Sequence, residues 1–151
     1  MRKTTLILVL LLLAIAVMPA SAAVPLAVRF EVDETIASGG IFVATGPAVD
    51  AGEMCTGGDT VDLVVEASGR PGGDFRNLRV LKEFTCEDGS GTFSVFLTVR
   101  LDLTTHDTTA NWRVMRGGAG DYTNLGGGGT LVGIPNDQGA SILDIYTGTL
   151  H

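Results

Sequence analysis

The sequence predicts an all-β domain, and within that class a small closed antiparallel β-barrel of about eight strands. Apolar and polar residues alternate with a period of two along much of the chain, which is the pattern of strands with one face in a core. Segments rich in glycine and aspartate, which favour turns, separate these stretches. No long amphipathic helix, domain linker or tandem repeat interrupts the pattern, so residues 23–151 are expected to form one domain.

Residues 1–22 have the three regions of a secretory signal peptide. Arg2 and Lys3 give a positive start, residues 6–18 are an unbroken apolar run, and residues 20–22 are small, as a signal peptidase requires. A membrane-spanning helix needs about 20 apolar residues, so this run is too short for one. We therefore expect a secreted protein, extracellular or periplasmic, with no membrane attachment after cleavage.

The position of cleavage fixes the first residue of the mature chain. Cleavage after Ala22 gives a start at Ala23, and cleavage one residue later gives a start at Val24. The alternative is an uncleaved anchor, which the length of the apolar run disfavours.

Eight segments of the remaining chain carry strand patterns, separated by turn-forming residues. In the third, Val61, Leu63 and Val65 alternate with polar residues, so these three side chains are expected in the core, with Val64 as an exception. Residues 87–91 join two strong strands and have the Asp-Gly chemistry of a hairpin. The expected strands lie near residues 28–33, 41–44, 61–66, 78–86, 93–102, 111–115, 130–134 and 142–147.

A barrel fits these strands better than an immunoglobulin-like sandwich. Such a sandwich expects a tryptophan between its two cysteines, whereas Trp112 follows both Cys55 and Cys86. A barrel of about eight strands has a lumen that side chains fill or that holds one small ligand.

Cys55 and Cys86 are expected to form a disulfide. An exported chain meets an oxidising environment, and two cysteines allow one intramolecular pairing. The alternatives are two free thiols or a metal site, but zinc takes four ligands and no histidine lies near either cysteine in the sequence.

Charge and motifs exclude several classes of partner. The chain has 17 acidic and 10 basic residues, a net charge of −7, which disfavours nucleic acid and anionic membrane surfaces. The glycine-rich stretch at 118–129 lacks the lysine and the following helix of a phosphate-binding loop. We therefore expect no nucleotide and no other cofactor.

No catalytic or metal-binding constellation is apparent. The two histidines, His106 and His151, lie in a polar loop and at the last position, so neither builds a Ser-His-Asp or Cys-His system. His106 with Asp102 or Asp107 lacks a third metal ligand. Residues 87–91 lack the alternating oxygen ligands of a calcium loop, so no metal site is expected.

A motif in the C-terminal part of the chain resembles that of a known family. Its members are Trp112, Gly118, Gly120, Tyr122, Gly127 and Gly129. Their order resembles the tryptophan, Gly-Thr-Gly-x-aromatic, Gly-x-Gly stretch of allene oxide cyclase-like barrels, which include plant dirigent proteins and bacterial secreted proteins. Residues 144–151 also resemble the last strand of such bacterial members. Ala119 stands where threonine or serine is usual, and Gly126 where a charged residue is common.

The resemblance implies a fold and a lumen suited to hydrophobic small molecules, and it transfers no reaction. The glycines permit tight bends and close backbone approach, and Tyr122 is expected to fold back and plug one end of the barrel.

Two residues are candidates for contact with a ligand. Lys82 lies an even number of residues from Leu78, Val80 and Phe84, so it is on the same face of the strand. If that face is the lumen, Lys82 points inward, where it could hold an anionic ligand. The alternatives are a bulge at residues 81–82 or a lysine that reaches to the barrel mouth, and these are favoured over a functional lysine because bulges are common near barrel rims. Phe96 is an aromatic residue among polar neighbours on its strand. Three roles are open for it: lining the lumen, packing against a connection, or forming a subunit contact.

The function expected from these features is binding of a small apolar molecule in the lumen. One alternative is a cyclase or isomerase that uses the lumen as a template, and another is a structural or interaction protein with a plugged lumen. The sequence leaves the ligand and the oligomeric state open.

Overall fold

A computed structural model describes residues 24–35, 38–136 and 140–151, so the expected signal peptide and its cleavage site lie outside the described residues. Within this part of the chain, no helix is long and apolar enough to cross a membrane. The one helix found there, α2, covers Pro47–Asp50.

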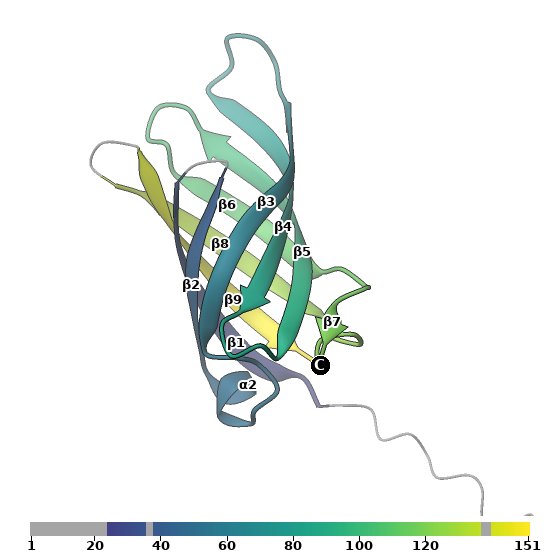
Figure 1. The fold of residues 1–151 in the computed structure, drawn as a ribbon. Coiled ribbons are helices and arrows are strands. Elements are labelled where there is room, and N and C mark those ends of the chain that lie inside the picture. The colour runs from purple at the N-terminus through teal and green to yellow at the C-terminus, as the bar shows by residue number, and fades with distance from the viewer. Residues whose placement is uncertain (1–23, 36–37, 137–139) are drawn as a thin grey trace, which may run out of the picture.

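Eight antiparallel strands form a closed barrel, as the sequence predicted (Figure 1). Around the ring they are β1 (Leu26–Thr35), β2 (Gly39–Thr45), β3 (Gly57–Ser68), β4 (Phe75–Cys86), β5 (Gly91–Asp102), β6 (Thr108–Val114), β8 (Gly127–Pro135) and β9 (Ser141–Leu150). The β4–β5 hairpin pairing closes the ring, since β9 already pairs with β1. A two-residue strand, β7 (Ala119–Gly120), lies outside the ring and pairs with the start of β5.

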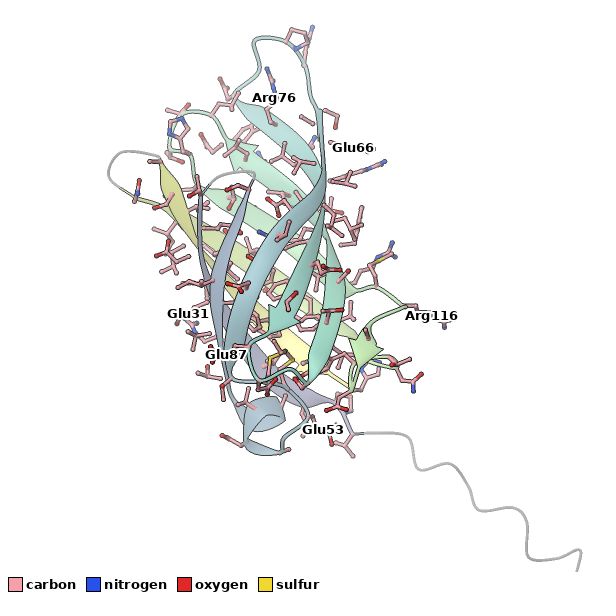
Figure 2. The ribbon with its side chains drawn as sticks, in the orientation of Figure 1. Glu31, Glu53, Glu66, Arg76, Glu87 and Arg116 are labelled. Atoms are coloured by element: carbon pink, nitrogen blue, oxygen red, sulfur yellow. A yellow bond between two sulfur atoms is a disulfide. The ribbon has the colours of Figure 1, made fainter. Side chains whose placement is uncertain are left out.

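The two ends of the barrel differ in what they carry. One end has the β3–β4 and β5–β6 connections, and we call it the cavity end; it is at the top of Figure 1. The opposite end has α2, the β4–β5 turn and β7, and we call it the disulfide end. The charged side chains Glu31, Glu66 and Glu87 lie on the outer surface (Figure 2).

The register of β3 corrects the face assigned to its apolar residues. Thr60 is buried, whereas Val61 and Leu63 are about half exposed, so the expectation that these two face the core is wrong. The pairing with β4 shifts by one residue between Asp62 and Val64, which is a β-bulge. A one-residue shift exchanges the two faces of a strand, and Val65 therefore returns to the lumen beyond the bulge.

Aromatic rings fill the lumen around Phe30, which is fully buried. Its ring centroid lies between 5.6 and 6.2 Å from those of five neighbours, mostly in edge or tilted geometry. These neighbours are Phe42, Phe84, Phe93, Trp112 and Tyr146. This part of the lumen is therefore a packed core and not a binding space.

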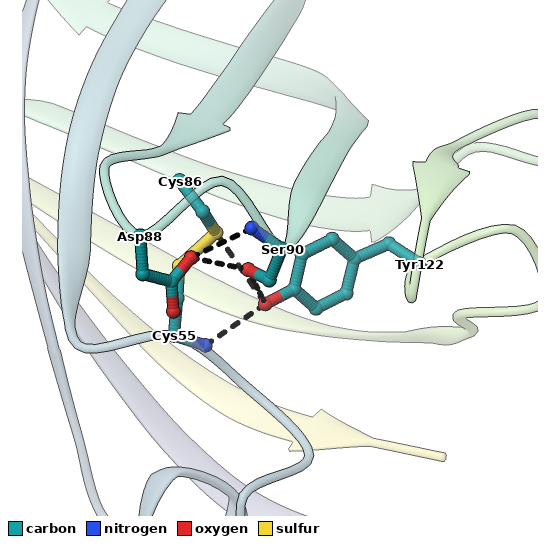
Figure 3. The surroundings of a disulfide bond; sticks show 5 residues. All are labelled: Cys55, Cys86, Asp88, Ser90 and Tyr122. Carbon is teal, nitrogen blue, oxygen red and sulfur yellow. Dashed lines mark hydrogen bonds between the residues drawn. A yellow bond between two sulfur atoms is a disulfide. The ribbon is translucent and has the colours of Figure 1, made fainter.

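The predicted disulfide between Cys55 and Cys86 is present and ties the segment after α2 to the end of β4 (Figure 3). Tyr122 lies beside it, buried, and its hydroxyl accepts a hydrogen bond from the backbone N–H of Cys55 at 3.0 Å. The same hydroxyl lies 2.9 Å from Oγ of Ser90, which in turn donates to Asp88 at 2.6 Å. Disulfide, tyrosine and turn thus form one connected unit at this end.

Reduction of the disulfide should lower the free energy of unfolding by about 2–3 kcal/mol. The chain-entropy relation gives about 3.7 kcal/mol for this separation of 31 residues, and measured losses commonly fall below that value. Urea unfolding with and without reductant measures the loss, and a Cys55→Ala/Cys86→Ala double variant controls for the reductant itself. Two titratable thiols in the native oxidised protein would contradict the pairing.

Candidate functional site

A cavity of about 230 Å³ occupies the lumen at the cavity end. Its walls are mostly apolar, and it reaches the exposed His106 in the β5–β6 connection, so it communicates with the surface. Thr108 lines it near the same rim. The apolar lining residues are Val65, Leu78, Val80, Leu97, Val99, Leu101, Leu131 and Ile142.

Four charged residues lie on the inner side of this cavity, and we call them the carboxyl–lysine cluster: Glu34, Asp62, Lys82 and Asp144. Strand alternation places each of them in the lumen. Glu34 follows the buried Val32 on β1 by two residues, and Asp144 lies between the inward Ile142 and Tyr146 on β9. Asp62 lies opposite Lys82 in the β3–β4 register, just before the bulge.

Lys82 is held by two carboxylates. Its Nζ atom donates to Oε2 of Glu34 and lies 3.0 Å from Oδ1 of Asp62. The lysine is 2% exposed, and a buried ammonium needs such partners to offset the loss of water. The bulge lies in β3, and the alternation of β4 is unbroken: Val80, Lys82 and Phe84 are all buried on one face, so Lys82 points inward.

The third carboxyl, Asp144, is 7% exposed and behaves differently. Burial, followed by the negative charge of Glu34, raises its pKa to about 7. Burial also raises the pKa of Glu34, although Lys82 opposes this. The Asp144 and Glu34 carboxyls share a side-chain hydrogen bond, which requires a proton on one of them. The cluster therefore retains a proton near neutral pH.

Three buried side-chain oxygen atoms in or beside the cluster lack hydrogen-bond partners within the described residues: Oδ1 of Asp62, Oδ1 of Asp144 and the hydroxyl of Tyr146. The first of these still lies 3.0 Å from Nζ of Lys82, in an ion pair. Burial, together with the negative charge of Asp144, raises the pKa of Tyr146 well above its usual range. Unsatisfied buried polar atoms are uncommon in folded proteins, so the Asp144 oxygen, whose residue lines the cavity, marks its inner side as a place for a polar partner.

Comparison with protein-family models, with curated proteins and with solved structures finds no match to this chain.

Lys82 is placed inside the lumen, but its charge is already compensated. Glu34 and Asp62 both contact it, and Asp144 adds a further acidic group nearby. An anionic ligand would meet this excess of carboxyls, so the structure does not support the anion-binding role considered for Lys82.

Phe96 lies on the outer face of β5, which corrects the possibility that it lines the lumen. Its neighbours Val95 and Leu97 point inward, so strict alternation turns Phe96 outward. There the guanidinium of Arg113 lies 5.3 Å from its ring centroid, a cation–π contact across the β5–β6 pair.

The aromatic and glycine motif lies outside the cavity lining. Trp112 is buried, and its Nε1 donates to the carbonyl of Thr130 at 3.1 Å. A Cβ atom at Gly148, on the neighbouring strand β9, would lie 2.6 Å from the tryptophan ring, so only glycine leaves it room. Gly120 has φ of 64°, which glycine adopts readily, in the turn that leads to Tyr122. Gly118, Gly127 and Gly129 likewise approach backbone atoms of neighbouring segments.

The loop residues considered for metal binding have other contacts. Asp102 accepts hydrogen bonds from the backbone N–H groups of Thr104 at 2.7 Å and Thr105 at 3.1 Å, which lower its pKa. In the described part of the chain, no group of three or more histidine, cysteine, aspartate or glutamate side chains is arranged to hold a metal ion.

Sequence reasoning missed Glu34, Asp62 and Asp144. For Glu34 and Asp144 a signal existed: each lies an even number of residues from the inward-facing apolar residues of its own strand. The same alternation rule had predicted that Lys82 points inward. Applied to acidic residues, it would also have predicted two of the neighbours of Lys82.

Proposed function

We propose that the barrel binds a small, largely apolar molecule in the cavity at its cavity end. The observation that carries this proposal is the division of the lumen: aromatic rings pack one part, while about 230 Å³ stays open beside a few fixed polar groups. Concave, mostly apolar sites with a few convergent polar groups are typical of ligand pockets.

The volume sets the size of the ligand. A buried apolar cavity of about 150 Å³ is known to hold benzene, so 230 Å³ suits roughly nine non-hydrogen atoms. At about 0.6 kcal/mol per atom, within the usual range of ligand efficiency, such a molecule would bind with Kd on the order of 100 µM.

Export and family are part of the same proposal. The signal-like residues 1–22 support secretion, and the Cys55–Cys86 disulfide is compatible with an oxidising compartment. The closed eight-stranded barrel agrees with what an allene oxide cyclase-like family would have, and the order of the Trp112–Gly129 motif supports that membership.

A lumen-templated isomerase or cyclase is the second candidate, because one observation favours it. Asp144 has a pKa raised to about 7, mainly by burial, so it can give or accept a proton at neutral pH. A bound compound recovered in chemically altered form would establish this candidate. Loss of that turnover in Asp144→Asn would assign the proton transfer to this carboxyl.

Filling the cavity should abolish binding without unfolding the barrel. Val99 is buried on β5 and lines the cavity, so Val99→Phe should weaken binding of 2-phenylethanol at least tenfold by occupying its space. The matched control is Thr98→Phe, which adds the same ring to the exposed face of the same strand. Binding is measured by chemical-shift titration. Equal affinity of the two variants, or no binding to the wild-type protein, would contradict the proposal.

A further inference from the structure

We infer that the cavity selects a protonated amine: its ligand is a small apolar body that carries one ammonium group, seated against Asp144. This inference rests on the proposed function and specifies the class of ligand. It is carried by the charge balance of the carboxyl–lysine cluster, by an unpartnered buried oxygen of Asp144, and by the cavity that this residue lines.

The charge balance of the cluster favours a cation. Three carboxyls from β1, β3 and β9 face a single ammonium from β4, and all four side chains are buried. Even with one proton shared between Glu34 and Asp144, the cluster carries one negative charge more than Lys82 neutralises. An ammonium group would offset this excess negative charge, which increases by one more when the shared proton leaves, and buried charges are tolerated when they are paired.

Asp144 presents the atom that such an ammonium would contact. Its Oδ1 atom is buried and has no hydrogen-bond partner within the described residues, although its residue lines the cavity. An ammonium is a donor without acceptor capacity, which is what an unpartnered carboxylate oxygen requires.

The neighbouring strand approaches Asp144 closely. Gly133 lies opposite Asp144 in the β8–β9 register, and a Cβ atom there would fall 2.3 Å from Oδ1 of Asp144 and 2.0 Å from Oγ1 of Thr108. Any side chain at position 133 would therefore collide with these atoms. Glycine at this position lets the Asp144 carboxyl keep its place in the cavity lining.

Groups from every strand around Asp144 determine how binding depends on pH. The negative charges of Glu34 and Asp62 disfavour ionisation of Asp144, and the positive charge of Lys82 favours it. Tyr146, on the same strand as Asp144, is an uncharged hydroxyl. The neighbouring strand β8 contributes Leu131 and Gly133, which do not titrate. His106 lies at the rim. An ammonium favours ionised Asp144, so its binding releases the proton that this carboxyl holds near pH 7. Affinity for an amine should therefore rise with pH.

Three probes of matched size test the inference: 2-phenylethylamine, 2-phenylethanol and phenylacetate, titrated into the folded protein at pH 6 and pH 8. We expect the amine to bind at least tenfold tighter than the alcohol at pH 8, and the acid to bind weakest. Because Asp144 titrates near 7, amine affinity should increase about tenfold from pH 6 to pH 8, while alcohol affinity should not increase.

The Asp144→Asn variant should remove both the preference for the amine over the alcohol, measured as a ratio within that variant, and its pH dependence. Asp33→Asn, the same change at an exposed position of β1, should alter neither. The wild-type titrations decide the question even where Asp144→Asn fails to fold.

The outcomes separate the two proposals. Alcohol binding with no preference for the amine, or a preference for phenylacetate, overturns the inference and leaves the proposed function standing. Failure of all three probes to bind overturns both. Amine preference that persists unchanged in Asp144→Asn also overturns the inference, because it would place the ammonium elsewhere.

Discussion

Replacing Lys82 by methionine is expected to destabilise the barrel by about 3–5 kcal/mol at pH 8. The substitution keeps an unbranched side chain of similar length, so little space is created, but it removes the ammonium that Glu34 and Asp62 contact. Removing one partner of a buried ion pair leaves an uncompensated buried charge, which costs this amount in other proteins. Urea unfolding followed by circular dichroism measures the loss.

The loss of stability caused by Lys82→Met should become smaller as pH falls, because the pKa values of two carboxyls in the cluster are raised. Asp144, with a pKa of about 7, and Glu34, whose pKa is also raised, bind protons more tightly in the folded protein than in the unfolded chain. Their contribution to stability is therefore favourable at low pH and is lost as pH rises through the folded-state pKa. At pH 5 the lysine-free cluster can protonate, so Lys82→Met should be least harmful there.

The matched control is Arg79→Met, which removes a positive charge from an exposed position on the same strand. Surface charges contribute about 0–1 kcal/mol, so this variant should stay close to wild type at both pH values. Equal losses for the two variants, or a Lys82→Met loss that is the same at pH 5 and pH 8, would show that the cluster is not the cause.

Local patterns in the sequence were sufficient for the barrel itself. Alternation predicted strands near residues 28–33 and 93–102, in which Phe30 and Leu97 are buried, and the expectation of export together with two cysteines led to the Cys55–Cys86 pair. These features depend on residues that are close together in the sequence or on the number of cysteines, so the sequence alone was sufficient to predict them.

The candidate site could be predicted only in part, because it depends on side chains that meet across the barrel. Lys82 and Glu34 are 48 residues apart, and nothing in either strand alone shows that they pair. The bulge in β3 is also invisible in the pattern: Val61 and Leu63 alternate as core residues would, yet the register with β4 turns them outward. An open cavity results from the sizes of facing side chains, which periodicity does not describe.

The division of the lumen separates the residues that stabilise the barrel from those that we propose bind a ligand. Phe30 and its five aromatic neighbours fill one part, and the disulfide with Tyr122 lies at the end of the barrel beyond them. The cavity end carries polar groups that are costly to bury, a pattern found where a protein gives up stability for a site. Changes in the aromatic part should therefore affect unfolding and leave the cavity walls in place.

The substitution Phe30→Ala should cost about 3–5 kcal/mol, because it removes a fully buried ring that packs against five others. Phe96→Ala removes the same ring from the outer face and should cost at most about 1 kcal/mol, mainly the contact with Arg113. Urea unfolding at pH 6 compares the two variants.

Since Phe30 does not line the cavity, the folded fraction of Phe30→Ala should still bind 2-phenylethanol with wild-type affinity. A tenfold loss of binding in that variant would show that the aromatic part shapes the cavity, and equal costs for the two phenylalanines would place the stabilising core elsewhere.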